Sequence, residues 1–270
     1  MKSFDYLMDS NKETLRLDVK TDPDTVIKQA TWAGLKKGMR VADMGFGSGK
    51  TSYALHKLTG ADGEVVGLDF AEDRISFARK HYKKDGIDFL CKDIRKPIED
   101  VGTFDFIYVR FVLEYYRSES FDIVKNISDV LSPNGILTLI DLDHNCLNHY
   151  GLSKKLEMTL FDIMEVLQKE ANFDPYAGRK LYHYLWELGY EDIDVDMKPH
   201  HLIFGELKDI DAYNWTKKAQ VAVKKAGYDF PRYSGSFDAF YDDFMAFFNH
   251  PGRFTYTPLL CCRGRKPENA

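Results

Sequence analysis

A short apolar segment that runs directly into a glycine-rich turn constrains the fold of this chain most. Residues 40–44 read RVADM, which suits a buried strand, and the turn GFGSGKTS follows at 45–52. Glycine lacks Cβ and tolerates positive φ, so glycines at alternate positions let the backbone approach a ligand closely. A strand, such a turn and the helix-like segment at 52–58 together favour a nucleotide-binding α/β scaffold.

The same order of strand, turn and helix recurs up to about residue 141. Apolar segments predict strands at 40–44, 64–69, 87–93, 104–113 and 136–141, and amphipathic segments predict helices at 52–58, 71–84 and 120–131. Strands that alternate with helices imply a parallel sheet with helices on both faces. We therefore predict an α/β fold with a Rossmann-like, doubly wound sheet.

After residue 141 the pattern changes. Helical spacing of apolar residues predicts helices at 152–171, 177–190, 209–226 and 235–249, and strand-like segments lie at 191–204 and 253–265. We expect two further strands of the sheet, separated by helices that form a lid. The aromatic stripe at 236–249 fits a core-facing helix, and an apolar wall for a bound acceptor is the alternative.

The charge balance and the cysteine pattern weigh against several classes of protein. A net charge of −5 over 270 residues argues against a nucleic-acid-binding surface. The four cysteines lack CxxC spacing, which suggests neither a zinc site nor a disulfide framework and fits a reducing compartment. Residues 1–17 lack the apolar run of a signal peptide, and no window approaches the roughly 18 apolar residues of a membrane span. We expect a cytoplasmic protein with no membrane partner.

Two phosphate-binding loops come close to the glycine turn, and neither fits it. The triphosphate loop G-x-x-x-x-G-K-[ST] matches at Gly49 and the two residues after it, but its first glycine would fall on Met44. The dinucleotide fingerprint G-x-G-x-x-G matches at Gly45 and Gly47, but its third glycine would fall on Lys50. A nicotinamide-dependent oxidoreductase on a similar sheet remains an alternative function.

An acid followed by three alternating glycines fits better: Asp43, Gly45, Gly47 and Gly49. Here the sequence resembles the class I S-adenosylmethionine-dependent methyltransferases. Segments similar to this family's later elements follow in order at 65–79, 91–94, 104–116 and 131–143, and residues 254–267 look like the last strand of its small-molecule branch. The resemblance covers most of residues 30–143.

The resemblance implies a mostly parallel seven-stranded sheet with an antiparallel last strand and helical lid insertions. It also implies S-adenosyl-L-methionine as cofactor, S-adenosyl-L-homocysteine as product, and a small-molecule methyl acceptor. The expected organisation is an N-terminal helical lid segment at 1–30, a cofactor-binding core at 31–145, and substrate or lid insertions with the last two strands at 146–270. Whether the protein is a monomer or a homodimer stays open.

The family's binding residues map onto the carboxyl ends of the predicted strands, where open α/β sheets place ligands. Asp69 would accept both ribose hydroxyls, Asp93 would accept the adenine amino group, and Ile94 would pack on the ring. Either acid alone would equally serve as a helix cap. The expected cofactor-binding residues are Asp43, Gly45, Phe46, Gly47, Gly49, Asp69, Phe70, Asp93, Ile94, Arg110 and Arg16.

Three of these residues have roles nearer the methionine end. Asp43 would orient the loop or meet the ligand's amino group, and Arg110 and Arg16 are candidates beside the methionine portion. Lys50 is expected to open a helix and face water.

Methyl transfer is an in-line displacement at an activated carbon, so alignment supplies much of the catalysis and no dedicated catalytic residue is required. If the acceptor carries a proton, His144 or His149, which follow the fifth strand, would be suitable bases, although both fit ordinary loop histidines better. His200 and His201 lack partners at metal-binding spacing, so no metal site is predicted. Because catalysis needs no signature residue, a non-catalytic protein that binds S-adenosylmethionine or S-adenosylhomocysteine remains a further alternative.

Overall fold

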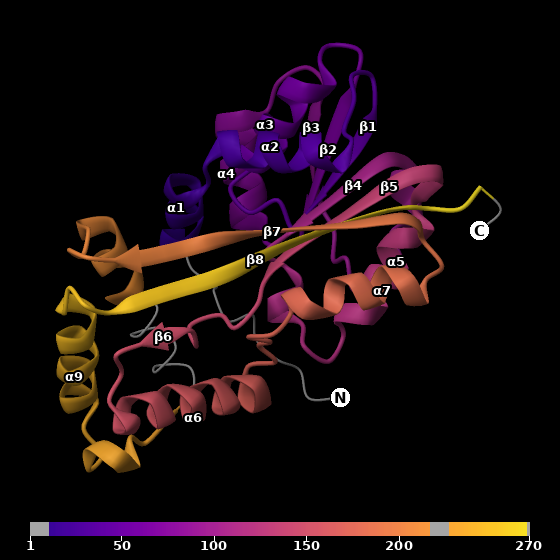
Figure 1. Cartoon of the computed structure of the whole chain (residues 1–270). Coiled ribbons are helices and arrows are strands. Elements are labelled where there is room, and N and C mark those ends of the chain that lie inside the picture. Colours follow the sequence, from indigo (N-terminus) through magenta and orange to yellow (C-terminus); the bar gives the residue numbers. More distant parts are fainter. Residues whose placement is uncertain (1–10, 217–226, 269–270) are drawn as a thin grey trace.

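The computed structural model describes residues 11–216 and 227–268 and places one large sheet at the centre of the chain (Figure 1). Its strands are β1 (Arg40–Met44), β2 (Glu64–Asp69), β3 (Ile87–Cys91), β4 (Phe104–Arg110), β5 (Leu131–Leu142), β6 (His149–Tyr150), β7 (Glu191–Phe204) and β8 (Phe254–Arg265). Their spatial order is β3-β2-β1-β4-β5-β8-β6, and β7 also pairs with β8.

The direction of the strands matches the expected fold. Strands β1 to β5 pair in parallel, whereas β8 runs antiparallel to its neighbours β5, β6 and β7. The predicted mostly parallel sheet with an antiparallel last strand is therefore confirmed. The two-residue strand β6 was not predicted, because a segment that short carries no periodic signal.

Helices cover both faces of the sheet, which makes it doubly wound. The described helices are α1 (Asn11–Lys20), α2 (Pro23–Ala33), α3 (Lys50–Thr59), α4 (Glu72–Tyr82), α5 (Ser120–Asp129), α6 (Lys154–Glu170), α7 (Leu181–Glu187) and α9 (Phe237–Asn249), with a further helical segment at 209–216. Helices α2 and α3 share a core with Val41 and Tyr108 on one face, and α5 and α7 share a core with Leu68 and Val109 on the other. Strands buried on both faces are typical of parallel sheets.

A second core lies in the C-terminal half of the chain, between α6 and α9. The apolar stripe of α6 and the aromatic stripe of α9 meet there, and Phe240, Phe244 and Phe248 are almost fully buried. Helix α9 begins at a cap in which the Ser236 hydroxyl accepts a hydrogen bond from the Ala239 N–H over 3.1 Å. The aromatic stripe is therefore core, as the first of the two interpretations expected.

The start of β5 differs from the prediction of a strand at 136–141, which left the turn-forming residues at 132–135 before the strand. In the structure β5 begins at Leu131, and its pairing with β4 shifts register between Phe104 and Phe106. Asn134 adopts a φ of 63° inside this irregular stretch. The turn residues thus form an irregularity within the ladder instead of preceding it.

Parts of two predicted segments lie outside the described residues, namely 1–10 of the expected N-terminal lid and 217–226 of the expected helix at 209–226. Within the described ranges, none of the helices has the length and apolar composition needed to cross a bilayer.

Candidate active site

The glycine loop after β1 adopts the conformation that its sequence requires. Gly45, Gly47 and Gly49 have φ values of 73°, 62° and 90°, which side chains of L-residues rarely allow. The loop is also tightly enclosed: a Cβ at Gly45 would lie 2.6 Å from a Val112 methyl group, and one at Gly49 would lie 2.7 Å from the Ala78 Cβ. The loop is therefore held between the segment after β4 and helix α4.

Asp43 lies directly beneath this loop, at the carboxyl end of β1. Its carboxylate accepts a hydrogen bond from the Ser52 hydroxyl over 2.7 Å, which ties the strand to the first turn of α3. Burial raises the pKa of Asp43 to about 7, against the opposing effect of the Ser52 hydrogen bond; the charge of Asp69 raises it further and that of Arg110 lowers it. Asp43 thus lies close to both groups that the sequence placed near the cofactor.

Asp69 joins the glycine loop to the next strand. Oδ2 accepts a hydrogen bond from the Gly47 N–H over 3.2 Å, Oδ1 accepts one from the Ala71 N–H over 3.0 Å, and Arg74 lies 3.5 Å away. Only 3% of Asp69 is exposed, and burial raises its pKa although Arg74 and the two amides oppose this. Each carboxylate oxygen has two lone pairs, so ribose hydroxyls would bind beside these donors or in place of them.

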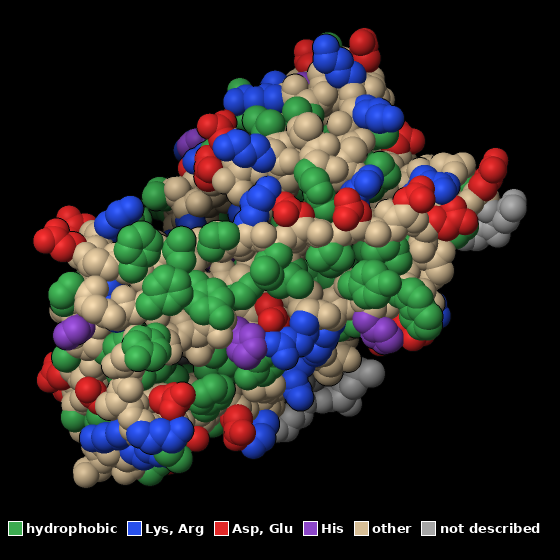
Figure 2. Space-filling model, in the orientation of Figure 1, with side chains coloured by type: hydrophobic (Ala, Val, Ile, Leu, Met, Phe, Trp, Pro, Cys, Tyr) green, Lys and Arg blue, Asp and Glu red, His purple; other side chains and the backbone are tan. Residues whose placement is uncertain are grey.

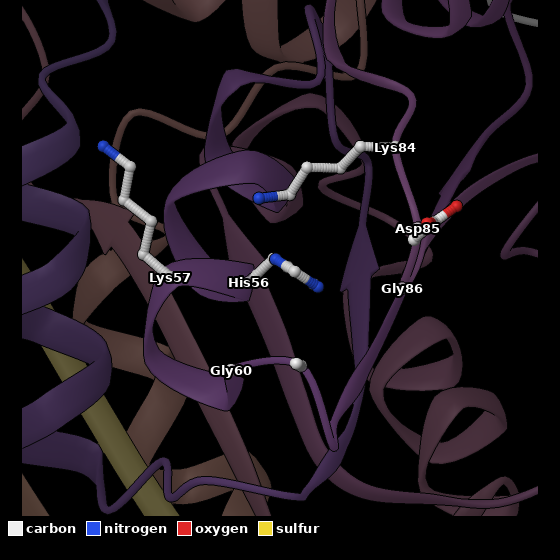
Figure 3. Close-up of a pocket in the computed structure, with 7 residues that line it drawn as sticks. His56, Lys57, Gly60, Lys84, Asp85 and Gly86 are labelled. Atoms are coloured by element: carbon white, nitrogen blue, oxygen red, sulfur yellow. The ribbon is translucent and has the colours of Figure 1, made fainter.

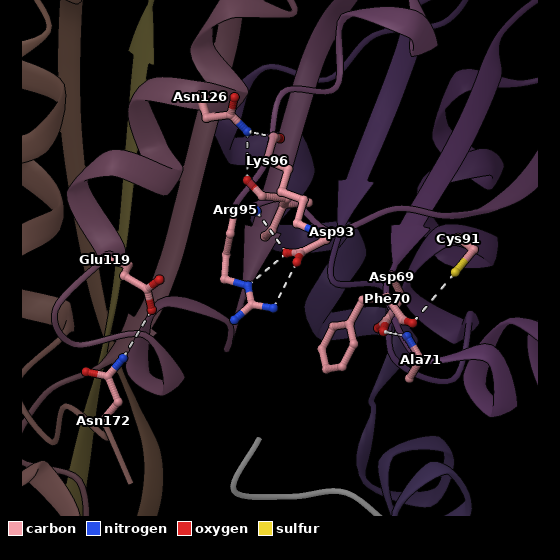
Figure 4. A network of polar contacts seen from close by, with 11 residues as sticks. Asp69, Phe70, Ala71, Cys91, Asp93, Arg95, Lys96, Glu119, Asn126 and Asn172 are labelled. Atoms are coloured by element: carbon pink, nitrogen blue, oxygen red, sulfur yellow. Dashed lines mark hydrogen bonds and ion pairs between the residues drawn. The ribbon is translucent and has the colours of Figure 1, made fainter. Parts of the chain in front are cut away.

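Asp93 is held by a residue that the sequence reasoning missed. The Arg95 guanidinium donates to both carboxylate oxygens of Asp93, over 2.9 and 2.8 Å (Figure 4). The backbone N–H of Arg95 donates a third hydrogen bond to the same carboxylate, over 3.1 Å. Burial would raise the pKa of Asp93, but the hydrogen bonds and charge of Arg95 hold it below its usual value. The spacing D-x-R at the end of a strand is the only signal in the sequence for this pair.

Tyr116 is a second residue of the site that the sequence did not single out. Its buried ring lies 5.6 Å below the Arg95 guanidinium. Burial raises its pKa to about 12, and the nearby charges of Asp69 and Asp93 act in the same direction. Tyr116 therefore lies close enough to Asp69 and Asp93 for their charges to affect its pKa. The Phe70 ring lies between Asp69 and the Asp93–Arg95 pair in Figure 4.

Two expected contact residues point into the protein core instead. The Phe46 ring packs against Phe89 with 4.8 Å between ring centroids, above Gly67, whose missing side chain leaves the space. Ile94 is buried in the core on the α5 side of the sheet. Contacts of Phe46 and Ile94 with a ligand would therefore come mainly from their backbone.

Helix α1 covers the glycine loop. The Leu17 side chain lies 3.2 Å from the place that a Cβ on Gly47 would occupy. Lys50, which was expected to face water, instead donates from Nζ to the Asp18 carbonyl over 2.8 Å, and the Tyr82 hydroxyl bonds the Asp18 carboxylate. Lys50 begins α3 as expected, but the expectation that it faces water was wrong, because no local pattern indicates that a distant helix would supply an acceptor.

Arg110 ends β4 beside Asp43, whose pKa its charge lowers. Its guanidinium stacks on the Phe111 ring, with 4.1 Å to the centroid. Arg16 lies on α1, half-buried. The structure therefore brings Arg110 to the loop, and it places Arg16 on the helix that covers the loop.

Comparison with known proteins places the chain in a family. A family model described as a methyltransferase domain matches residues 35–189. The chain belongs to this methyltransferase family. The resemblance to S-adenosylmethionine-dependent methyltransferases that the sequence showed is thereby confirmed.

Curated relatives of this methyltransferase include demethylmenaquinone methyltransferases. The protein from Staphylococcus aureus (strain MRSA252) is 28% identical over 143 residues, which cover 51% of this chain and 58% of the relative. The protein from Lactococcus lactis subsp. lactis is 27% identical over 152 residues, which cover 55% and 57%. The chain thus matches little more than half the length of these relatives.

Solved structures share the fold at low identity. A candidate methyltransferase from Bacillus halodurans aligns with a TM-score of 0.57 at 16% identity, over 90% of this chain and 99% of that chain. A Haemonchus contortus phosphoethanolamine N-methyltransferase 2, in complex with S-adenosyl-L-methionine, aligns with a TM-score of 0.55 at 12% identity, over 96% and 57%. The [4+2]-cyclase SpnF aligns with a TM-score of 0.53 at 17% identity, over 99% and 88%. These likenesses establish the expected fold for the methyltransferase.

The two candidate bases of the methyltransferase have different surroundings. His149 bonds through Nδ1 to the Thr255 hydroxyl over 2.8 Å and through Nε2 to the Cys146 carbonyl over 3.1 Å. Both of its ring nitrogens are therefore used to hold the C-terminal core together. The His144 ring packs edge-on against Tyr176, with 5.2 Å between centroids. His144 is thus the better placed of the two to meet an acceptor.

A buried acidic network lies at the ends of β4 and β5, and the sequence reasoning missed it. Asp141 accepts hydrogen bonds from the N–H groups of Glu114 over 3.0 Å and Leu142 over 2.9 Å, and the Asn145 amide donates to Glu114 over 2.8 Å. Burial raises the pKa of Asp141 well above its usual value, and the charge of Glu114 adds to this. Asp141 is therefore harder to ionise than an isolated carboxyl.

A hollow of about 550 Å³ lies at the opposite end of the sheet from these residues. Figure 3 shows the side chains of His56, Lys57 and Lys84 around it. Burial lowers the pKa of His56, and the charge of Lys84 lowers it further. Open α/β sheets bind ligands at the carboxyl ends of their strands, and this hollow lies at the amino ends of β2 and β3, so we do not assign the reaction to it.

Proposed function

We propose that this protein transfers a methyl group from S-adenosylmethionine to a small-molecule acceptor. The observation that carries the proposal is the hydrogen bond between Gly47 and Asp69. A loop that binds phosphate offers free N–H donors to the ligand, whereas this loop directs one of its donors to a carboxylate. The carboxyl ends of β1 and β2 therefore present acceptors, Asp43 and Asp69, which suit the hydroxyl and amino groups of a phosphate-free adenosine ligand.

The proposed roles follow from the positions of the charged groups. Asp69 would bind the ribose hydroxyls, and Asp93, held in place by Arg95, would accept the adenine amino group. Arg110 would bind the carboxylate of the methionine portion, and Asp43 its amino group. Helix α1 would exclude water from the glycine loop.

Bound at these strand ends, S-adenosylmethionine would supply a methyl carbon already activated by positive sulfur. The chain's part is to align the acceptor opposite the sulfur and to keep water out. If the acceptor loses a proton, His144 or the Glu114–Asp141 pair would receive it, because His144 follows β5 and the pair lies at the carboxyl ends of β4 and β5.

A small-molecule acceptor is supported by the curated relatives, which are named demethylmenaquinone methyltransferases. The net charge of −5 disfavours nucleic acid as the substrate. The cysteines at positions 91, 146, 261 and 262 are free thiols, which supports a reducing compartment such as the cytoplasm.

A thermal-shift panel tests the choice of cofactor. S-adenosylmethionine and S-adenosylhomocysteine should raise the unfolding temperature in a concentration-dependent way, whereas NAD, NADP and ATP should not. Stabilisation by NAD or ATP alone would overturn the proposal. Formation of S-adenosylhomocysteine in the presence of a metabolite library then separates an enzyme from a protein that only binds the cofactor.

A further inference from the structure

The outer edge of β7 is an exposed sheet edge with an unusual composition. Strand β7 pairs with β8, and none of the strands in residues 11–216 and 227–268 pairs with its other side. Figure 2 shows a band of hydrophobic side chains across this side of the molecule. Proteins usually protect such edges, because the free backbone groups invite pairing with another strand.

The hydrophobic side chains on this side come from one face of the β7–β8 ribbon. Cross-strand pairing places Met197 opposite Leu260, Leu202 opposite Tyr256 and Phe204 opposite Phe254. Met197 and Phe204 are 66% and 63% exposed, and the row also includes Val195, Leu202, Phe254 and Tyr256. A contiguous row of exposed apolar side chains of this size is typical of a contact surface.

The charged residues of β7 are ordered so that two antiparallel copies of the strand complement each other. Its first half carries acids and its second half carries a lysine and two histidines: Glu191, Asp192, Asp194, Asp196, Lys198, His200 and His201. When two such strands pair antiparallel, the acidic half of each lies against the half of the other that carries Lys198 and no acid. A pairing centred on Met197 brings Asp196 opposite Lys198 on both sides of the axis and brings no two like charges together.

The backbone N–H and C=O groups on the outer edge of β7 are also compatible with a pairing centred on Met197. Pro199 lies opposite Pro258, and neither residue has an N–H that could donate to the ladder. The two residues therefore form a pair without ladder hydrogen bonds, in which both carbonyl groups point away from the opposite strand. The polar groups of Met197 and Val195, which precede Pro199 at alternate positions, therefore point outward as well. In agreement, the Val195 N–H is bonded over 2.9 Å to the Asp194 side chain.

We propose that β7 pairs antiparallel with β7 of a second copy of this chain, about a two-fold axis through Met197. The two Met197 residues exchange backbone hydrogen bonds, and the Val195 N–H donates to the carbonyl of the partner's Pro199. Asp196, which lies 2.9 Å from Lys198 within one chain, also faces the partner's Lys198. The two sheets then form one continuous sheet.

Helix α7 completes the proposed contact. It precedes β7 and packs against the ribbon on its apolar face, where Ile193 joins the core, and it exposes Tyr182 and Trp186. In the paired arrangement the C-terminal end of the partner's β7, which carries Leu202 and Phe204, runs toward the N-terminal end of β7, next to α7. The apolar end of one strand thus meets the aromatic side chains of the other chain's helix.

The apolar and the charged side chains of β7 contribute differently to the affinity and the selectivity of the proposed dimer. The apolar side chains supply the area, while exposed ion pairs mainly fix the register. Pro199 shortens the ladder, because it cannot donate and proline is tolerated only at such edges. A short ladder with a fixed charge order favours a second copy of the same strand over an unrelated one.

Charge exchange tests the proposal. In sedimentation velocity at micromolar concentration, the wild type should sediment as two 31.2-kDa chains. Asp196→Lys and Lys198→Asp should each weaken the dimer at least tenfold, and the double variant, which restores opposite charges across the axis, should recover it. Lys154→Asp, which changes an exposed charge on α6, is the control and should leave the dimer unchanged.

Cross-linking tests the position of the axis. Opposed residues of an antiparallel pair have Cα atoms about 5.5 Å apart, which a disulfide spans, so Met197→Cys should form covalent dimers under mild oxidation. Val19→Cys on α1 and the wild type, which has an exposed thiol at Cys91, set the background. A monomer at every concentration, a dimer indifferent to the charge changes, or a monomer that sediments with phosphatidylglycerol vesicles would overturn the proposal. None of these results depends on methyl transfer.

Discussion

The Gly47 N–H donates a hydrogen bond to Oδ2 of Asp69 over 3.2 Å, and this bond joins the glycine loop after β1 to the end of β2. The same carboxylate receives the Ala71 N–H at the start of α4. One buried acid therefore organises the loop, the second strand and the next helix. Any ligand at the carboxyl ends of β1 and β2 meets a surface that this carboxylate has shaped.

Replacing Asp69 should weaken cofactor binding. Asp69→Ala removes an acceptor for buried donors, which costs on the order of 1–3 kcal/mol, so the Kd for S-adenosylhomocysteine should rise about 5- to 150-fold in calorimetric titration. Asp73→Ala, which changes an exposed acid on α4, is the matched control. If Asp69→Ala folds poorly, Asp69→Asn gives the same comparison with a smaller structural change. An unchanged affinity in a folded variant would remove Asp69 from the site.

The buried carboxyl of Asp43 should make stability fall as pH rises. Its pKa of about 7 in the folded state exceeds the value near 4 in the unfolded chain, so the unfolded state ionises first and folding loses stability between these pH values. Asp43→Asn keeps an acceptor for Ser52 and removes this loss. The variant should match the wild type near pH 4 and gain up to about 4 kcal/mol in free energy of unfolding at pH 8.

Urea unfolding of Asp43→Asn and the wild type between pH 4 and pH 8 checks this prediction. A difference that does not change with pH would mean that Asp43 titrates normally in the folded protein. Because the variant also loses a negative charge, its affinity for S-adenosylmethionine should fall even though its stability rises.

Gly49→Ala should destabilise the folded protein through close packing as well as through the positive φ of this position. Gly49→Ala places a Cβ 2.7 Å from the Ala78 Cβ, whereas Gly38, with a comparable φ of 78°, has open space around it. Both variants incur the cost of a left-handed residue, about 1–2 kcal/mol, and only Gly49→Ala adds overpacking of about 1–3 kcal/mol. Equal losses in urea unfolding would show that the loop moves aside easily.

The sequence predicted the strands β1 to β4 and the mostly parallel direction of the sheet well, because short apolar strands alternate with amphipathic helices. It also placed Asp43, the three glycines and Asp69 together, since the carboxyl ends of neighbouring parallel strands meet at one edge. Their roles in binding remain predictions.

The rest depends on contacts between distant residues, for which one sequence carries no local signal. Lys50 meets Asp18 on α1, and Phe46 turns into the core because Gly67 leaves room for its ring. The contact of Arg95 with Asp93 is local, but many arginines lie two residues from an acid without forming such a pair. The acidic network joins Asp141 in β5 to Glu114 in the segment after β4, and only the folded chain brings these two residues together.

A crystal structure of the protein with S-adenosylhomocysteine tests the central claim most directly. We predict that the ligand lies across the carboxyl ends of β1, β2 and β3, with its ribose hydroxyls within hydrogen-bonding distance of the Asp69 carboxylate and its adenine amino group at Asp93. A ligand bound elsewhere, with side chains filling this crevice, would contradict the account.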